Sequence, residues 1–136
     1  QVMNRTTDIC STCVPVSILV LTKAFKELNI APLHHYGADW AGSGHLYIVR
    51  LLGKTREEAN KVIEKMADRG IACNVHYMPL PMMTAYKKLG FDIKNYPNAF
   101  AFFENEITLP LNTRMDEEDL EYVIEIQMNT LNLFDF

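Results

Sequence analysis

Residues 70–111 read GIACNVHYMPLPMMTAYKKLGFDIKNYPNAFAFFENEITLPL, and this stretch decides the fold that we expect. Its first part, 71–77, alternates apolar with polar residues, which is the period of a β-strand. Side chains on a strand point alternately to its two faces, so Asn74 and His76 are expected to share the face away from the helices. The residues expected to face the core are Ile71, Cys73 and Val75.

The remainder of this stretch predicts short elements. Residues 79–105 are interpreted as two short helices around a turn at Gly90, and 107–109 as a brief strand that Pro110 ends. A final helix is expected to begin near Asp116, because acidic residues crowd its first turn and oppose the helix dipole favourably. Its expected core-facing residues are Leu120, Val123, Ile124 and Met128.

The helix before residue 70 is the most clearly specified element. Thr55 and Glu58 have the spacing of a capping box, in which each side chain binds the main-chain N–H of the other residue. Gly70 followed by Ile71 is typical of a helix C-terminus with its hydrophobic contact. The apolar stripe of this helix consists of Ala59, Val62, Ile63, Met66 and Ala67.

The N-terminal half predicts one more helix and one more strand. Apolar residues recur at helical spacing as far as Asn29, and Pro15 marks the first turn of this helix. After a polar loop at 34–44, residues 45–52 are rich in β-branched and aromatic side chains and predict a strand covered on both faces. The helical repeat consists of Ile18, Leu21, Phe25 and Leu28.

These elements predict a single α/β (α+β) domain over residues 14–136, preceded by an irregular arm at 1–13. The expected architecture is a small three- or four-stranded sheet with helices covering one face. A ferredoxin-like sandwich is the nearest alternative. No internal repeat or linker divides the chain.

Composition excludes several classes of function. The 136 residues are 49% hydrophobic and 22% charged, as in ordinary globular domains, with a net charge of −4. The basic residues are scattered, so we expect no nucleic-acid partner. The longest apolar run, 14–21, is far shorter than the roughly 20 residues of a membrane span, so no membrane partner is expected. Three cysteines form no disulfide framework, which agrees with a cytoplasmic protein.

Several short motifs, taken in order, resemble those of one enzyme family. They are His45-Leu46-Tyr47, Arg56, Gly70-Ile71, Val75-His76-Tyr77, Pro79-Leu80, Tyr86, Gly90-Phe91, Tyr96-Pro97-Asn98-Ala99 and Leu109-Pro110-Leu111. Between about Leu21 and Ile124 the chain resembles the C-terminal small domain of the DegT family of pyridoxal-phosphate-dependent sugar aminotransferases. The order and spacing of the motifs carry this resemblance.

The resemblance implies the fold of the C-terminal small domain of a fold-type-I aminotransferase. It also implies a parent reaction that transfers an amino group from an amino acid to a keto-sugar nucleotide. Members of the family are longer and carry their cofactor chemistry in an N-terminal large domain. We therefore expect this chain to be a fragment or split part of such an enzyme, inactive alone. Its expected partner is the missing large domain, or a second copy in a homo-oligomer.

The parent family uses pyridoxal phosphate, but no cofactor is expected in this chain. Such an enzyme holds the cofactor through a lysine, a carboxylate at the pyridinium nitrogen and a cradle for the phosphate. The lysines here lie in polar or solvated contexts, none of them in the family's lysine motif. Gly42-Ser43-Gly44 lacks the strand-to-helix context of a phosphate loop. No catalytic and no cofactor-binding residue is therefore predicted.

His76, with Asn74 and Tyr77 beside it, is the candidate substrate-binding site. On the sheet face away from the helices, His76 would meet the large domain and line the rim of the substrate site. The alternative is a structural histidine that binds only a neighbouring residue. Many family members have a second histidine after the Pro-Leu pair, where contact with the sugar is expected. This chain has Pro81 at that position, so the family's usual sugar contacts do not carry over to it directly.

Cys10 and Cys13 have the spacing of a redox pair or of half a zinc site. Further ligands at suitable spacing do not follow, since His34 and His35 are far away in the sequence and are assigned to a surface loop. No metal site is therefore predicted, and a redox or metal protein is the third of the hypotheses considered.

Arg50 and Arg56 could each bind a carboxylate with both arms of the guanidinium. The simpler interpretation is favoured for both. It makes Arg50 a charge at the end of a strand and Arg56 a surface residue in the first turn of a helix.

The second hypothesis for function is a stand-alone binding or dimerisation module without catalysis. It rests on an apolar segment that another domain or a second copy could cover. The residues concerned are Met78, Met82 and Met83.

Overall fold

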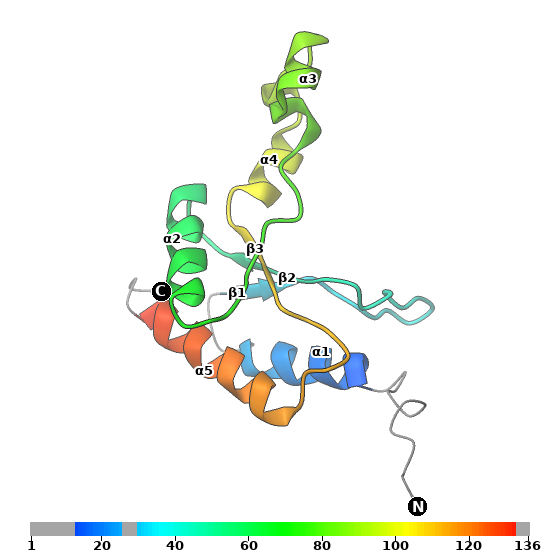
Figure 1. Ribbon diagram of the computed structural model, residues 1–136. Helices are drawn as coiled ribbons and strands as arrows, with labels where there is room; N and C mark the ends of the chain where they lie inside the picture. The colour runs from blue at the N-terminus through cyan, green and yellow to red at the C-terminus, as the bar shows by residue number, and fades with distance from the viewer. Residues whose placement is uncertain (1–12, 26–29, 133–136) are drawn as a thin grey trace, which may run out of the picture.

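The computed structural model describes residues 13–25 and 30–132. Two predicted segments lie outside these residues: the irregular arm, except for Cys13 where the first helix begins, and the end of that helix at 26–29. The elements in chain order (Figure 1) are α1 (Cys13–Ala24), β1 (Ile30–Pro32), β2 (Tyr47–Leu51), α2 (Arg56–Ala67), the 3-10 helix η2 (Leu80–Met82), α3 (Thr84–Lys88), the 3-10 helix η3 (Ile93–Asn95), α4 (Pro97–Phe103), β3 (Glu106–Leu109) and α5 (Glu117–Asn132).

The sheet has three antiparallel strands in the order β1-β2-β3, which confirms the predicted small α/β architecture. Ile30 pairs with Leu51 on one side of β2, and Ile107 pairs with Val49 on the other. The sequence does not predict β1, because three residues are too few to show an alternation.

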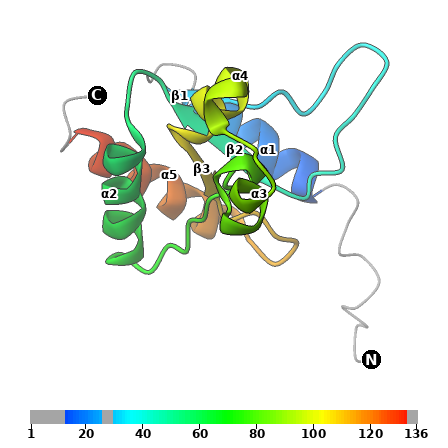
Figure 2. The same ribbon diagram turned by 90° about the horizontal axis from the view of Figure 1, so that it is seen from above.

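One face of the sheet carries the hydrophobic core. Figures 1 and 2 show α1, α2 and α5 on this side, whereas α3 and α4 lie on the other. Tyr47, Val49 and Leu51 of β2 are buried beneath the helices. The hydroxyl of Tyr47 lies 3.0 Å from Thr22 Oγ1 of α1, so this buried phenol keeps a hydrogen bond. The helical residues of the core are Ile18, Leu21, Phe25, Ala59, Val62, Met66, Leu120, Val123, Ile126 and Leu131.

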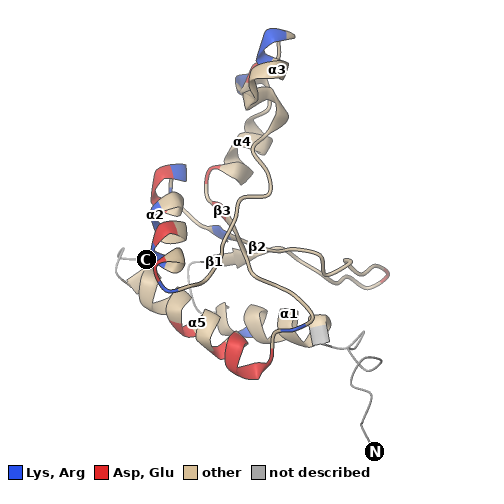
Figure 3. Cartoon of the chain, in the orientation of Figure 1, with Lys and Arg blue, Asp and Glu red and all other residues tan. Residues whose placement is uncertain are grey.

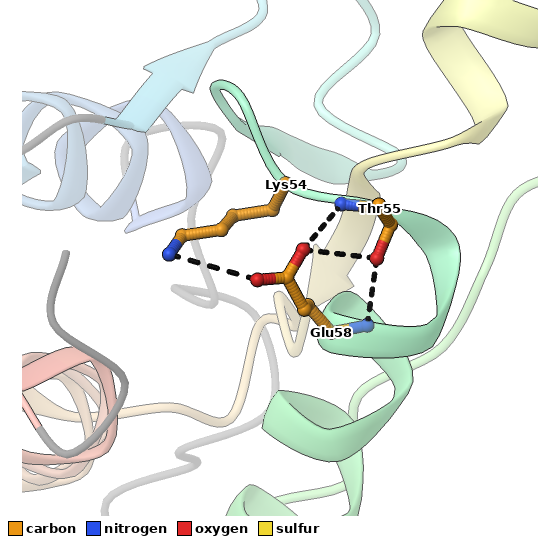
Figure 4. A network of polar contacts seen from close by, with 3 residues as sticks. All are labelled: Lys54, Thr55 and Glu58. Carbon is orange, nitrogen blue, oxygen red and sulfur yellow. Dashed lines mark hydrogen bonds and ion pairs between the residues drawn. The ribbon is translucent and has the colours of Figure 1, made fainter.

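The start of α2 confirms the predicted capping box (Figure 4). Thr55 donates its main-chain N–H to Glu58 Oε2 at 2.8 Å, and Glu58 donates its own to Thr55 Oγ1 at 3.3 Å. Lys54 Nζ lies 3.8 Å from Glu58 Oε1. The hydrogen bonds from Thr55 lower the pKa of Glu58. After the helix, Gly70 adopts a φ of 78°, as the predicted stop requires.

The strand predicted at 71–77 is wrong in extent. Only Asn74 pairs with Thr108, as an isolated antiparallel bridge. The next two main-chain N–H groups bind side chains and so cannot join a strand ladder. The N–H of Val75 donates to Asn74 Oδ1 at 2.8 Å, and the N–H of His76 donates to the carboxylate of Glu106. Val75 is only half-buried and lies outside the core, contrary to the prediction.

The start of α5 agrees with the prediction, and one of its core assignments does not. Asp116 Oδ1 accepts the N–H of Asp119 at 3.0 Å, so an aspartate caps the acidic first turn. Met128 is 38% exposed, because Gln127 occupies the core-facing position of that turn. The buried residues of α5 are Leu120, Val123, Ile126, Gln127, Thr130 and Leu131.

Residues 77–103 (the protrusion) rise from the sheet on the side opposite the core (Figure 1). Their short helices confirm the prediction, and Gly90 makes the turn between them with a φ of 88°. The rings of Tyr86, Phe91 and Tyr96 pack in sequence, with centroids 5.9 and 6.5 Å apart. The large exposed apolar residues of the protrusion are Tyr77, Met78, Leu80, Met83, Leu89, Phe91, Tyr96 and Phe100.

Charged side chains are concentrated on two of the helices that cover the core. Figure 3 shows acidic residues gathered at the start of α5 and mixed charges along α2. Within the described residues, no helix combines the length and the apolar character needed to cross a bilayer.

Candidate functional site

The candidate site lies at the root of the protrusion, on the sheet face opposite the core. Glu106 and Thr108 share this face of β3, because Ile107 and Leu109 belong to the core on the other side. Arg50 of β2 is in register with Glu106. Polar side chains of two strands thus gather where the chain enters and leaves the protrusion.

His76 is held at two atoms by β3. Its main-chain N–H donates to Glu106 Oε1 at 2.9 Å, and its ring Nδ1 lies 2.9 Å from Thr108 Oγ1. Asn74 fixes the segment beside it through two main-chain hydrogen bonds with Thr108, at 3.0 and 2.8 Å. His76 therefore binds neighbours, as the structural interpretation expects. Within the described part of the chain its Nε2 makes no hydrogen bond, which leaves that nitrogen available to a ligand.

The other two predicted site residues behave differently. The side chain of Asn74 is turned back onto the N–H of Val75 and does not reach His76. Tyr77 is 68% exposed, and its ring meets the His76 ring edge-on with centroids 4.8 Å apart. The structure thus brings Tyr77 to His76, although regular alternation would have turned Tyr77 toward the core.

Glu106 is a site residue that the sequence analysis missed. Its side chain is 0% exposed. Burial raises the pKa of Glu106, while the hydrogen bond from His76 and the charge of Arg56 oppose this shift. Its Oε2 has no hydrogen bond among the described residues. The available signal was the alternation of β3, which puts the carboxylate of Glu106 and the hydroxyl of Thr108 on one face and two apolar residues on the other.

Arg56 joins α2 to the root of the protrusion. Its Nη1 donates to the main-chain oxygens of Phe103 and Glu106, at 2.9 and 2.7 Å, and its guanidinium lies 5.4 Å from the centroid of the Phe103 ring. Burial lowers the pKa of Arg56, and the charge of Glu106 opposes this shift. The interpretation of Arg56 as a surface residue is therefore wrong, because it is a half-buried bridge between two elements.

Arg50 makes a second bridge from β2. Its Nε donates to Asn105 Oδ1 at 3.0 Å and its Nη2 to the main-chain oxygen of Ala101 at 2.9 Å, and the guanidinium lies 5.6 Å from the Phe102 ring centroid. It lies near the end of β2, as interpreted, and its guanidinium also forms the hydrogen bonds that connect this strand to Ala101 and Asn105. The two arginines bind carbonyl groups at the C-terminal end of α4, where the helix dipole favours cations.

The two histidines of the 34–44 loop differ in their surroundings. His35 stacks on Tyr47, with ring centroids 5.4 Å apart and an interplanar angle of 3°, and desolvation lowers the pKa of His35. His34 is exposed. The loop closes on itself through a bridge between Tyr36 and Ala41, which agrees with its assignment to the surface.

The cysteines supply no site that the structure describes. Burial raises the pKa of Cys73 to about 12, so its thiol keeps its proton near neutral pH. Cys10 and the side chain of Cys13 lie outside the described residues. The described residues contain no group of three or more His, Cys, Asp or Glu side chains placed to hold a metal ion.

A protein-family model described as the DegT/DnrJ/EryC1/StrS aminotransferase family matches residues 17–127. The chain belongs to this family. The family assignment confirms the resemblance found in the sequence.

Individual family members show how much of an enzyme this chain represents. The spore coat polysaccharide biosynthesis protein SpsC of Bacillus subtilis is 30% identical over 110 residues, which are 75% of this chain and 27% of SpsC. The UDP-4-amino-4,6-dideoxy-N-acetyl-beta-L-altrosamine transaminase of Helicobacter pylori is 28% identical over 117 residues, 85% of this chain and 31% of that enzyme. The chain therefore spans 27–31% of the length of these two relatives.

A solved structure agrees with both the fold and the coverage. Spr1654 of Streptococcus pneumoniae, assigned as a sugar aminotransferase and solved in its PMP form, superposes with a TM-score of 0.85 at 46% identity. The match covers 88% of this chain and 30% of Spr1654. The three-stranded sheet with its protrusion is thus one part of the DegT fold.

The described lysines do not form a pocket for the cofactor of the DegT family. Lys61 and Lys65 pair with acidic residues of α2 and its C-terminal end, and Lys54 pairs with Glu58. A lysine that binds pyridoxal phosphate has to be held against the cofactor in a pocket. The described residues therefore do not fit pyridoxal phosphate by themselves, and we assign no chemical step to them. The remaining described lysines, all exposed, are Lys23, Lys87, Lys88 and Lys94.

Proposed function

We propose that this chain serves as the small domain of a pyridoxal-phosphate-dependent aminotransferase that acts on a keto-sugar nucleotide. The observation that carries the proposal is the 46% identity and TM-score of 0.85 with Spr1654. Solved forms of that protein are described as PLP and PMP forms, and the relatives of this chain include transaminases named for a UDP-amino sugar. These similarities favour an aminotransferase segment over a stand-alone binding or dimerisation module.

In this proposal the remainder of the enzyme supplies the cofactor lysine, and this chain supplies one wall of the substrate site. His76 is the substrate-binding group, with Tyr77 and Asn74 beside it. The anchoring of His76 to Glu106 and Thr108 supports this role, because a ligand contact works best when its own rotamer is fixed. The chain alone is inactive, its partner is the large domain or a second copy, and it works in the cytoplasm.

A chimera tests the proposal directly. The segment of Spr1654 that matches this chain is replaced by residues 17–127, and the purified chimera is loaded with pyridoxal phosphate. We expect amino acids from a panel to convert the PLP spectrum to the PMP spectrum, and a keto-sugar nucleotide to reverse the change. His76→Ala in the chimera should slow the reversal by roughly tenfold, the loss of about one hydrogen bond. A folded, PLP-loaded chimera that does not respond to any keto-sugar nucleotide would contradict the proposal.

A further inference from the structure

Glu106 occupies an unfavourable place for a carboxylate. It is the first residue of a four-residue strand, and its side chain is 0% exposed. Burying a carboxylate costs free energy unless hydrogen bonds and charges compensate. Only one hydrogen bond reaches the carboxylate among the described residues, from the N–H of His76. An apolar residue would fill this position at lower cost, so the carboxylate needs a reason other than stability.

The geometry around His76 supplies a reason. Glu106 and Thr108 project from the same face of β3, two residues apart, and they bind two different atoms of His76. The carboxylate holds the main chain, and the hydroxyl holds ring Nδ1. Arg56 approaches from α2, where its bonds to main-chain oxygens keep the Glu106 backbone in place. His76 therefore has both its position and its ring orientation set from β3.

We propose that Glu106 is a positioning residue for His76. Its carboxylate fixes the main chain while Thr108 holds ring Nδ1, so that Nε2 points in one direction and offers a hydrogen bond to an oxygen atom of the ligand. For a nucleotide sugar that atom is a hydroxyl or phosphoryl oxygen. The inference rests on the proposed substrate-binding role of His76, and it adds the residue that makes the role specific.

Nuclear magnetic resonance of the isotope-labelled chain tests the inference without substrate or cofactor. At pH 8, where an ordinary imidazole is neutral, the ring protons of His76 should show nuclear Overhauser contacts to the Thr108 side chain, as expected for a ring that Thr108 holds at Nδ1. Exposed His45 serves as the internal reference. Glu106→Gln should keep this signature, because the amide oxygen accepts the same bond. Glu106→Val should shift the His76 amide signal upfield and weaken the contacts between the His76 ring and Thr108, because the main chain is no longer held.

Stability measurements separate positioning from a structural role. Glu106→Val removes a buried carboxylate, which should stabilise the chain, and leaves the His76 N–H without its acceptor, which should destabilise it, so the urea midpoint should change little. If Glu106→Val does not fold, Glu106→Met is used in its place, because methionine keeps the length of the side chain without the acceptor. Thr108→Val should disturb the ring signals and leave the His76 amide signal unchanged. Glu104→Gln, at the C-terminal end of α4 and two residues before Glu106, should change neither signal.

Two results would overturn the inference. One is a folded Glu106→Val or Glu106→Met chain whose His76 amide and ring signals match those of the parent chain. The other is a parent chain in which the His76 ring shows no contact to the Thr108 side chain. Either result leaves the chimera test of amino transfer untouched. Conversely, an inactive chimera with an ordered His76 refutes the proposed function and not the positioning by Glu106.

Discussion

Arg56 Nη1 donates a 2.7 Å hydrogen bond to the main-chain oxygen of Glu106, and this bond ties α2 to the last strand of the sheet. Arg56→Lys should destabilise the chain by about 1–3 kcal/mol, because an ammonium group cannot reproduce the fork that also reaches Phe103. Urea unfolding followed by circular dichroism measures the loss. Arg114→Lys, at an exposed position, is the matched control. Equal stability of the two variants would contradict the bridging role.

The capping box of α2 gives a second prediction. Thr55→Ala removes the acceptor for the N–H of Glu58 and should cost about 1 kcal/mol. Thr113→Ala, in an exposed turn, should leave the unfolding midpoint unchanged. A Thr55→Ala variant as stable as the parent chain would show that Glu58 and the solvent cap the helix adequately without the hydroxyl.

The buried amide of Gln127 gives a prediction of the opposite sign. Its side chain is 0% exposed, and neither its Oε1 nor its Nε2 has a hydrogen bond among the described residues. Gln127→Met keeps the length of the side chain and removes an unpaired polar group, so it should raise the free energy of unfolding by about 1 kcal/mol or more. Glu125→Met, at an exposed position of α5, should have almost no effect. A loss of stability in Gln127→Met would mean that the amide has a partner.

Cys73 predicts a dependence of stability on alkaline pH. Burial raises the pKa of its thiol from 9.0 to about 12 in the folded chain. Between these values the unfolded chain releases the proton and the folded chain keeps it, so the free energy of unfolding falls as pH rises, by at most about 1.4 kcal/mol per pH unit from this group. Below pH 9 the contribution is constant. Cys73→Ala should flatten this slope in urea titrations between pH 8 and 10.5, and parallel curves for the two chains would contradict the buried thiol.

The lysine contexts predict how the purified chain responds to pyridoxal phosphate. Because the described lysines are either exposed or paired with acidic side chains, we expect no stoichiometric cofactor band that survives dialysis. Absorbance spectra and borohydride reduction followed by peptide mapping make the measurement. Labelling of a single lysine in a stoichiometric yield would contradict the prediction and identify a cofactor pocket in this chain.

Local patterns predicted the elements whose hydrogen bonds are local. The capping box of Thr55 and Glu58, the turn at Gly90 and the capped start of α5 follow from residues within one helical turn, and all three are present. The strand at 71–77 failed because its pairing depends on side chains of a distant strand. Glu106 takes a main-chain N–H that a ladder would need, and no periodicity within 71–77 reports that competition.

The candidate site was predictable only in part for the same reason. The family motif and the strand period bring attention to His76, and the structure gives it two partners on β3. Arg56 and Glu106 escaped because charged residues in a first turn and before a strand are usually exposed. The guanidinium of Arg56 lies against the ring of Phe103 at the end of the protrusion. The alternation of β3 indicates the face on which Glu106 lies, but no local pattern reports that distant residues bury it.

The protrusion is a long segment whose two ends lie side by side, since His76 and Glu106 are hydrogen-bonded to each other. Its short helices pack on one another, α3 with η2 and α4 with η3, while Arg50 and Arg56 fasten it to the body at its root. A region of this kind opens as its own cooperative unit, at a free energy below that of global unfolding. A protease that cuts near Leu89, which is 74% exposed, should therefore yield a nicked protein whose two pieces stay associated through the intact core.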